Sequence, residues 1–237
     1  MRRMHRLTGH DVAAKTTARC RAIDGACRLL AAISCLGAFP ALAAAADGGA
    51  APAIPVGKES GETIVFFRHG EKPPGGSGQL SCRGLNRALA LPAVLVGKFG
   101  VPEFLFAPNP SHQIEDAGKQ FDYIRPLATI EPTAVMFGLP VNTQWGLQQI
   151  GHLRRELLQP RYGQARIFVA WEHFLLAKLV KQLVAAGGAD PSLVPEWPPD
   201  DFDSIYVVTL QRSQGRLIAS FTLDHEGLDG QPTACPR

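Results

Sequence analysis

The sequence predicts an α/β fold: a three-layer α/β/α sandwich with a mostly parallel central sheet and an antiparallel edge hairpin. Short apolar runs typical of buried strands alternate with longer stretches in which apolar residues recur at three and four positions, as they do on one face of a helix. Near the end of the chain, residues 203–210 and 216–223 are two β-prone runs around Ser213-Gln214-Gly215, which predicts the hairpin. The chain of 237 residues is long enough for one such domain.

Each element follows from a local signal. Ile64-Val65-Phe66-Phe67 is a continuous apolar run, as expected of a strand buried on both faces. Ser81 can cap the helix that follows it, and Pro108 ends the second strand. The expected order is strand 63–67, helix 84–98, strand 103–107, helices at about 115–137 and 146–158, strand 166–170, helix 174–186, and the hairpin strands 203–210 and 216–223.

The first part of the chain has the pattern of a secretory signal peptide. Basic residues precede the apolar stretch 29–39, and Ala41-Leu42-Ala43 supplies the small residues of a cleavage site. The stretch is shorter than the about twenty residues that span a bilayer, so we expect no stable membrane insertion after cleavage. We therefore expect a signal peptide at 1–43, a flexible leader rich in Ala, Gly and Pro at 44–60, and one domain at 61–237 in a periplasmic or secreted protein. The true start codon stays open.

Cleavage changes what charge and cysteine content imply. Residues 1–43 contain seven of the 24 Lys and Arg and two of the 21 Asp and Glu, so the mature chain has a net charge of −2. The basic character of the precursor therefore gives no reason to expect a nucleic-acid partner. Of five cysteines, only Cys82 and Cys235 remain, and in an oxidising compartment they could pair. The sequence leaves open whether they do.

Two histidines follow predicted strands. Arg68-His69-Gly70-Glu71 stands directly behind the run 64–67, and Trp171-Glu172-His173 stands between the strand 166–170 and the next helix. Ligands of open α/β sheets bind outside the carboxyl ends of the strands, so both segments are candidates for a site. By itself, the tripeptide Arg68-His69-Gly70 favours a surface turn, and His173 could be a core histidine bonded to backbone.

A wider set of residues with this order resembles the histidine phosphatase, or phosphoglycerate mutase-like, superfamily. The resemblance covers most of residues 62–223. It implies a phosphate pocket of two arginines and two histidines, with His69 as nucleophile, and chemistry that needs neither a metal nor another cofactor. The residues that carry the resemblance are Arg68-His69-Gly70, Leu80, Ser81, Gly84, Arg125, Thr129, Gly138-Leu139-Pro140-Val141 and His173.

The chemistry of these residue types agrees with that pocket. Planar guanidinium groups meet phosphate oxygens with paired hydrogen bonds, which suits Arg68 and Arg125, although Arg125 could also be an ordinary solvated arginine. Nearby cations disfavour imidazolium, so His69 would stay neutral and keep one ring nitrogen free to attack phosphorus. His173 would donate to the equatorial oxygens of the transition state.

The chain departs from the family pattern at the general acid. No Asp or Glu stands between Pro132 and Arg155, where one branch of the family has its glutamate, and Phe174 stands where another branch has an aspartate. Glu172 is the nearest candidate in sequence for the acid, with a purely structural role as the alternative. Phe174 is expected to narrow the pocket or to wall one side of it. The polar stretch before Arg125 is expected to shape the entrance.

The sequence thus predicts a secreted, metal-independent phosphatase that hydrolyses phosphomonoesters on a phosphorylated small molecule or phosphopeptide. Its expected catalytic residues are His69, His173, Arg68, Arg125 and Glu172, and the first four would also bind the substrate. The alternatives are a phosphate-binding pseudoenzyme of the same fold, because the family acid is absent, and a phosphomutase. The natural substrate and the oligomeric state stay open.

Overall fold

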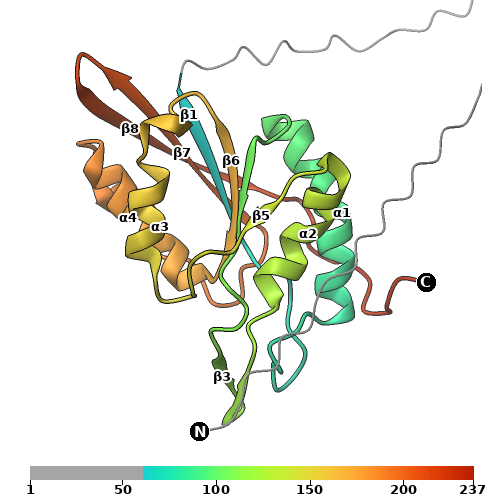
Figure 1. Ribbon diagram of the computed structural model, residues 1–237. Helices are drawn as coiled ribbons and strands as arrows, with labels where there is room; N and C mark the ends of the chain where they lie inside the picture. Colours follow the sequence, from blue (N-terminus) through green and yellow to red (C-terminus); the bar gives the residue numbers. More distant parts are fainter. Residues whose placement is uncertain (1–60) are drawn as a thin grey trace, which may run out of the picture. The chain divides into compact units, whose positions relative to one another are not determined.

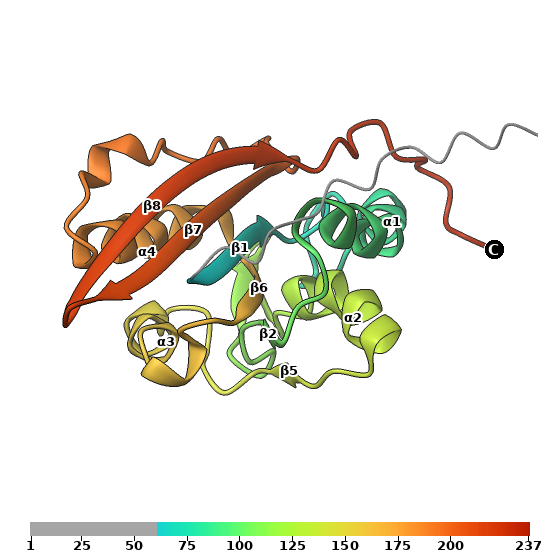
Figure 2. The same cartoon turned by 90° about the horizontal axis from the view of Figure 1, so that it is seen from above.

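A six-stranded mixed sheet lies between two layers of helices in the computed structural model, which describes residues 61–237 (Figures 1 and 2). The strand order is β5-β2-β6-β1-β7-β8. The strands are β1 (Glu62–Arg68), β2 (Phe104–Phe106), β5 (Val141–Asn142), β6 (Arg166–Trp171), β7 (Ser204–Ser213) and β8 (Arg216–His225). The helices are α1 (Cys82–Phe99), α2 (Arg125–Phe137), α3 (Ile150–Leu157) and α4 (His173–Ala186), with short 3₁₀ turns η1 (Pro160–Tyr162) and η2 (Pro191–Leu193).

The direction of the strands agrees with the predicted fold class. β5, β2, β6 and β1 run parallel to one another, whereas β7 is antiparallel to β1 and β8 is antiparallel to β7. The last two strands form the predicted hairpin at one edge of the sheet. The three-layer sandwich with a mostly parallel sheet and an antiparallel edge hairpin is confirmed.

Both faces of β1 are buried, as its continuous apolar sequence predicts. Ile64 and Phe66 belong to the core shared with α3 and α4, while Val65 and Phe67 belong to the core shared with α1 and α2. Successive side chains of a strand point to opposite faces, so a strand covered on both sides has no polar alternation. Figure 2 shows the two helix pairs on opposite sides of the sheet.

One predicted element is wrong over its first half. The helix expected from about residue 115 begins only at Arg125, and the chain before it forms a two-stranded antiparallel sheet of β3 (Ile114–Asp116) and β4 (Lys119–Phe121). Ala117 and Gly118 both have positive φ, at 50° and 75°, which makes the tight turn between these strands. The polar sequence of this hairpin has no apolar face to bury as a helix. The helix predicted at 146–158 is also shorter in the structure, where α3 covers Ile150–Leu157. The strand β5 was not predicted.

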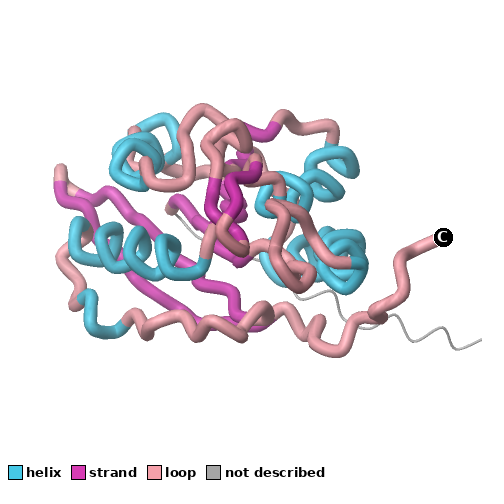
Figure 3. The backbone as a smooth tube through the Cα atoms, turned by 90° about the horizontal axis from the view of Figure 1, so that it is seen from below, coloured by secondary structure: helices cyan, strands magenta, loops and turns pink. Residues whose placement is uncertain are grey.

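The register of β1 against β6 brings the two histidine segments together. Arg68 lies opposite Trp171, and the backbone N–H of His69 donates to the carbonyl of Trp171 at 3.1 Å. The residues after both strands therefore emerge side by side at the carboxyl edge of the parallel strands. Figure 3 is a view from below, the side on which the β3–β4 hairpin lies in Figure 1.

After β8, the C-terminal segment returns to α1 and is bonded to it by a disulfide and by hydrogen bonds. Cys82, the first residue of α1, forms a disulfide with Cys235, with their Cα atoms 4.5 Å apart. The side-chain amide of Asn86 donates to two carbonyls of this C-terminal segment, each at 2.8 Å. The fully buried Arg87 pairs with Glu226 at 2.5 Å. The structure thus joins the two cysteines whose pairing the sequence left open.

Within residues 61–237, no helix has both the length and the apolar character needed to cross a membrane. The predicted signal peptide at 1–43 and leader at 44–60 lie outside the described residues.

Candidate active site

The five predicted site residues come from the ends of two strands and the starts of two helices. Arg68 is the last residue of β1 and His69 follows it; Arg125 is the first residue of α2. Glu172 is the N-cap of α4 and His173 is its first residue. The charges of Arg125, Arg68 and Glu172 all act on the His69 imidazole. The fold therefore brings all the predicted site residues to one edge of the sheet.

His69 is held as a neutral imidazole with one free nitrogen. Its side chain is buried, and Nδ1 lies 2.7 Å from the carbonyl oxygen of Gly70. Because a carbonyl only accepts hydrogen bonds, Nδ1 carries the hydrogen and Nε2 keeps its lone pair. Burial, reinforced by the positive charges of Arg125 and Arg68, lowers the pKa of His69 to about 3 despite the bond to Gly70.

Arg68 is fixed by the loop before β7. Its Nη1 donates to the carbonyl oxygens of Pro199 and Asp201 at 2.8 and 2.9 Å, and its guanidinium carbon lies 3.8 Å from the centre of the Phe202 ring. The Nε atom is buried and has no hydrogen-bond partner. One edge of this guanidinium is therefore bound to protein, while a second donor is left for a ligand.

Arg125 likewise has one guanidinium nitrogen bound to protein and another left without a partner. Its Nη1 lies 2.7 Å from Oδ2 of Asp116, and its Nε is buried without a partner. Thr129 connects this helix start to the His69 loop: its hydroxyl accepts from the N–H of Gly70 at 2.9 Å and donates to the carbonyl of Arg125 at 2.8 Å. The arginine and the histidine are thus held by one short chain of bonds.

Two residues near this arginine were missed by sequence reasoning. Asp116 comes from β3, inside the region where a helix was predicted, and Tyr123 lies between β4 and α2 with its ring centre 4.9 Å from the Arg125 guanidinium carbon. Neither stands in a motif. The polar stretch before Arg125 was expected to shape the site entrance, and it supplies both side chains.

The contacts of Glu172 speak against the acid role expected for it. Its two carboxylate oxygens accept hydrogen bonds from the N–H groups of Phe174 and Leu175 at 3.0 and 2.8 Å, which caps α4. Nδ1 of His173 lies 2.7 Å from Oε1, at ion-pair distance but not aligned as a hydrogen bond. Burial alone would raise the pKa of Glu172, but His173 and the two N–H groups together lower it. A carboxylate held this way is ionised at neutral pH and has no proton to give.

Two other nearby carboxylates are also engaged. Asp201 accepts from the N–H groups of Asp203 and Ser204 and from the Ser204 hydroxyl, so its carboxylate is bound within its own loop. Glu71 accepts from Nε and Nη2 of Arg87 at 2.9 to 3.2 Å. The expectation that Glu71 fixes its loop agrees with this pair.

A cavity of about 600 Å³ adjoins the site at Arg68. It is lined by Arg68, Glu71, Lys72, Ser81, Cys82, Arg83, Pro199, Phe202 and Thr233. Of the predicted site residues, only Arg68 lines this cavity, so it touches the site at this one arginine.

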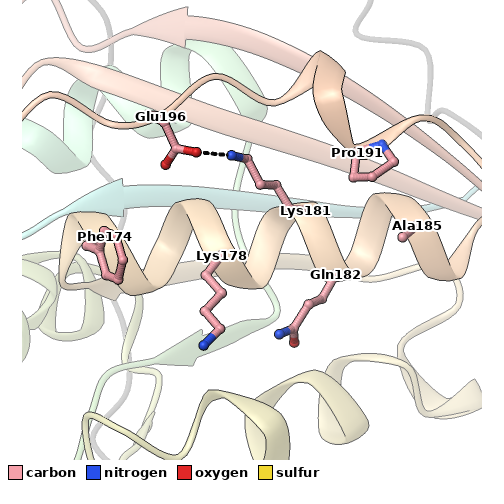
Figure 4. A pocket seen from close by; sticks show the side chains of 7 residues that line it. All are labelled: Phe174, Lys178, Lys181, Gln182, Ala185, Pro191 and Glu196. Carbon is pink, nitrogen blue, oxygen red and sulfur yellow. Dashed lines mark hydrogen bonds and ion pairs between the residues drawn. The ribbon is translucent and has the colours of Figure 1, made fainter.

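A second hollow of about 520 Å³ runs along the outer side of α4 (Figure 4). It is lined by Phe174, Lys178, Lys181, Gln182, Ala185, Pro191 and Glu196. None of the predicted site residues faces it. Phe174, expected to narrow the phosphate pocket, is instead 62% exposed and lines this hollow.

The described residues contain a site suited to an oxyanion. A neutral buried imidazole stands with two guanidinium groups that each keep one unpartnered donor. Within residues 61–237, no three His, Cys, Asp or Glu side chains are grouped as metal ligands. The remaining histidines of this region that were expected at the surface, His112, His152 and His225, are exposed.

No family model and no curated protein matches the chain. Solved structures similar to it include mycobacterial glucosyl-3-phosphoglycerate phosphatase with inorganic phosphate, at 16% identity and a TM-score of 0.46 over 69% of this chain and 95% of that one. Phosphoglycerate mutase from Plasmodium falciparum is 12% identical, with a TM-score of 0.45 over 68% and 89%. A mutant phosphoserine phosphatase from Entamoeba histolytica with phosphoserine is 10% identical, with a TM-score of 0.40 over 70% and 98%. At these identities and TM-scores, the similarities assign no activity to this chain.

Proposed function

We propose that this protein is a phosphatase that hydrolyses phosphomonoesters through a phosphohistidine intermediate on His69. The observation that carries the proposal is the state of His69: a buried imidazole whose Nδ1 hydrogen is bound to Gly70 and whose Nε2 lone pair stays free. Unpartnered buried donors on Arg68 and Arg125 support the phosphate as ligand, because buried polar groups in proteins are nearly always paired.

In the first step, His69 Nε2 attacks phosphorus and the bond to the leaving oxygen breaks. Arg68 and Arg125 hold the nonbridging oxygens, where charge collects in the transition state, and His173 adds a donor from the start of α4. In the second step, water attacks the phosphohistidine and releases inorganic phosphate. The two arginines supply the charge that balances the phosphate, so we propose that the reaction needs no metal.

The proposed substrates are phosphorylated small molecules or phosphopeptides met outside the cytoplasm. The signal-peptide pattern at 1–43 supports export, and the disulfide between Cys82 and Cys235 fits an oxidising compartment. Amino-terminal sequencing of the exported protein tests this proposal, with a start near Ala44 as the expected result. An intact stretch 29–39 in the exported species would contradict it.

A phosphate-binding pseudoenzyme is the second candidate. The observation in its favour is that the nearby carboxylates of Glu172, Asp201 and Glu71 are all engaged, so none of them is a free acid. Such a protein would bind phosphate but would not turn over a substrate. A phosphomutase would instead return the phosphoryl group to a second acceptor.

The test is turnover of p-nitrophenyl phosphate by the mature domain, with and without excess chelator. We expect equal rates in both, and a phosphate label on His69 after rapid quenching at neutral to alkaline pH. His69→Asn should abolish turnover and labelling, because no other nitrogen replaces Nε2. The matched control is His152→Asn, which changes an exposed histidine on α3 and should leave both unchanged.

The outcomes separate the candidates. Phosphate binding without turnover would favour the pseudoenzyme, and transfer of label to an added alcohol or sugar in place of water would favour the mutase. Activity restored only by added divalent metal, or label on a serine or aspartate, would contradict the proposed mechanism.

A further inference from the structure

Tyr123 differs from the other tyrosines of the chain in having a buried hydroxyl without a partner. Its side chain is 1% exposed, and its Oη makes no hydrogen bond. Of the three tyrosines, Tyr162 donates to Glu156 at 2.6 Å and Tyr206 donates to the carbonyl of Pro195 at 3.3 Å. Tyrosine hydroxyls usually find a partner when buried, so an unpaired one indicates a ligand that completes it.

The ring of Tyr123 lies next to two residues of the candidate phosphate pocket, His69 and Arg125. The Tyr123 and His69 rings meet edge to face, with centroids 5.9 Å apart and planes at 87°. The guanidinium carbon of Arg125 lies 4.9 Å from the Tyr123 centroid. The charges of Arg125, Glu172 and Arg68 all act on the phenol. Tyr123 is therefore surrounded by the residues proposed to bind and attack the phosphate.

The protonation state of Tyr123 suits a donor. Burial, with the negative charge of Glu172, raises its pKa more than Arg125 and Arg68 lower it through their charges and through the approach of the Arg125 guanidinium to the phenol oxygen. The hydroxyl therefore keeps its proton at neutral pH. By contrast, the carboxylate of Asp116 is ion-paired with Arg125, and Arg125 together with the N–H of Gly78 lowers its pKa although burial opposes this. Glu172 is a helix cap in its ionised form. Among the acidic groups near His69 in residues 61–237, Tyr123 is the one that keeps its proton and donates it to no acceptor in the protein.

We propose that Tyr123 donates the proton to the leaving oxygen in the phosphatase reaction, an inference that rests on the proposed function. As the bond from His69 Nε2 to phosphorus forms, the bond from phosphorus to the leaving oxygen breaks, and the Oη proton moves to that oxygen. The products of this step are the free alcohol, phosphohistidine and a tyrosinate balanced by the adjacent arginines. In the second step, the oxygen of water bonds to phosphorus while the bond from phosphorus to His69 Nε2 breaks and its electron pair returns to the nitrogen. The water gives one proton back to Tyr123, and inorganic phosphate leaves.

The role predicts a dependence on the leaving group. An alkyl alcohol is a poor leaving group and needs the proton, whereas nitrophenolate leaves without help. We therefore expect Tyr123→Phe to lower kcat/KM for an alkyl phosphate by about 10²- to 10⁴-fold, the usual size of general acid catalysis, and to lower it less than about tenfold for p-nitrophenyl phosphate. Phenylalanine keeps the ring contacts with His69 and Arg125 and removes only the hydroxyl.

The matched control is Tyr206→Phe, which removes a tyrosine hydroxyl that is bonded to the carbonyl of Pro195. This variant should not lower kcat/KM for one substrate more than for the other. Phosphohistidine formation from p-nitrophenyl phosphate by Tyr123→Phe provides a second readout and should remain. Equal losses on the two substrates, or no loss on either, would overturn the assignment while leaving the phosphatase proposal in place. A parent protein inactive on both substrates would instead contradict the proposed function.

A second experiment covers the case in which Tyr123→Phe does not fold. Replacing all three tyrosines with 3-fluorotyrosine makes each phenol more acidic and keeps its shape. We expect the substitution to change kcat/KM for an alkyl phosphate more than for p-nitrophenyl phosphate, because only the alkyl alcohol needs the proton of the phenol. Equal changes on the two substrates would overturn the role of Tyr123.

Discussion

The carboxylate of Asp116 lies 2.7 Å from Nη1 of Arg125, and both side chains are almost completely buried. The same Oδ2 accepts from the N–H of Gly78 at 3.1 Å, so the β3–β4 hairpin, the loop after β1 and α2 meet at one carboxylate. The ion pair leaves the Nε donor of Arg125 unpartnered. Asp116 thus orients the arginine. Its negative charge also offsets part of the positive charge that Arg125 presents to a bound anion.

We predict that Asp116→Asn binds inorganic phosphate more tightly. The amide oxygen can still accept from Arg125 and hold it in place, while a negative charge near the bound phosphate is removed. At the effective dielectric constant of a protein site, this is worth about 1 kcal/mol, or roughly a fivefold fall in Kd. Calorimetric titration with phosphate measures it. The control is Asp116→Ala, which releases Arg125 altogether and should gain less affinity for phosphate. An unchanged or weaker Kd in Asp116→Asn would contradict this reading of the ion pair.

Glu172→Gln should slow alkyl and aryl phosphates by the same factor. A glutamine has one acceptor oxygen in place of two, so it cannot bond both N–H groups of the α4 cap, and it removes the charge beside His173. Loss of a helix cap costs about 1 kcal/mol, which thermal or urea unfolding measures. A loss confined to alkyl phosphates would restore Glu172 as the proton donor and would count against Tyr123.

His69 should remain neutral well below neutral pH. Its pKa is lowered to about 3 in the folded protein, whereas an exposed histidine binds a proton near 6.5. Between these values the unfolded chain binds the proton and the folded one does not, so stability falls as pH is lowered through this range. We expect this one group to remove about 1–2 kcal/mol of unfolding free energy between pH 6.5 and 5.

Two measurements check this. Urea unfolding at both pH values should show a larger acid loss in the parent than in His69→Gln, which has no imidazole. The ¹⁵N resonances of the His69 ring, identified by their absence in His69→Gln, should stay constant between pH 5 and 8. A ring that titrates in that interval would contradict the neutral nucleophile.

The disulfide should stabilise the whole domain, because Cys82 and Cys235 are separated by 153 residues. Native disulfides typically contribute about 2–4 kcal/mol. We expect Cys82→Ser, Cys235→Ser and the double variant to lose the same amount in urea unfolding, since each breaks the same bond. Additive losses in the single variants, or two free thiols in the oxidised mature protein, would contradict the pairing.

The order of the main strands and helices and the two histidine segments could be predicted from the sequence, whereas the short strands β3, β4 and β5 could not. These predictions rested on local signals. The apolar run 64–67 is buried on both faces, as predicted, and β1 and β6 end just before His69 and His173. Parallel strands of one sheet end at the same edge, so residues that follow them meet there whatever lies between them in the chain. Arg125 could be selected because it stands in a family-like interval before Gly138.

The fold class follows from local sequence patterns, and so do the histidines and arginines that gather at one edge of the sheet. The roles of the neighbouring side chains depend on how distant segments pack together. Glu172 became a cap because the turn after β6 directs its carboxylate to the N–H groups of α4, and Asp116 and Tyr123 reach the site because residues 114–121 fold as a hairpin and not as a helix. The physical reason is that strand and helix periodicities are local properties, whereas the partners and burial of an ionisable side chain depend on elements far away in the sequence.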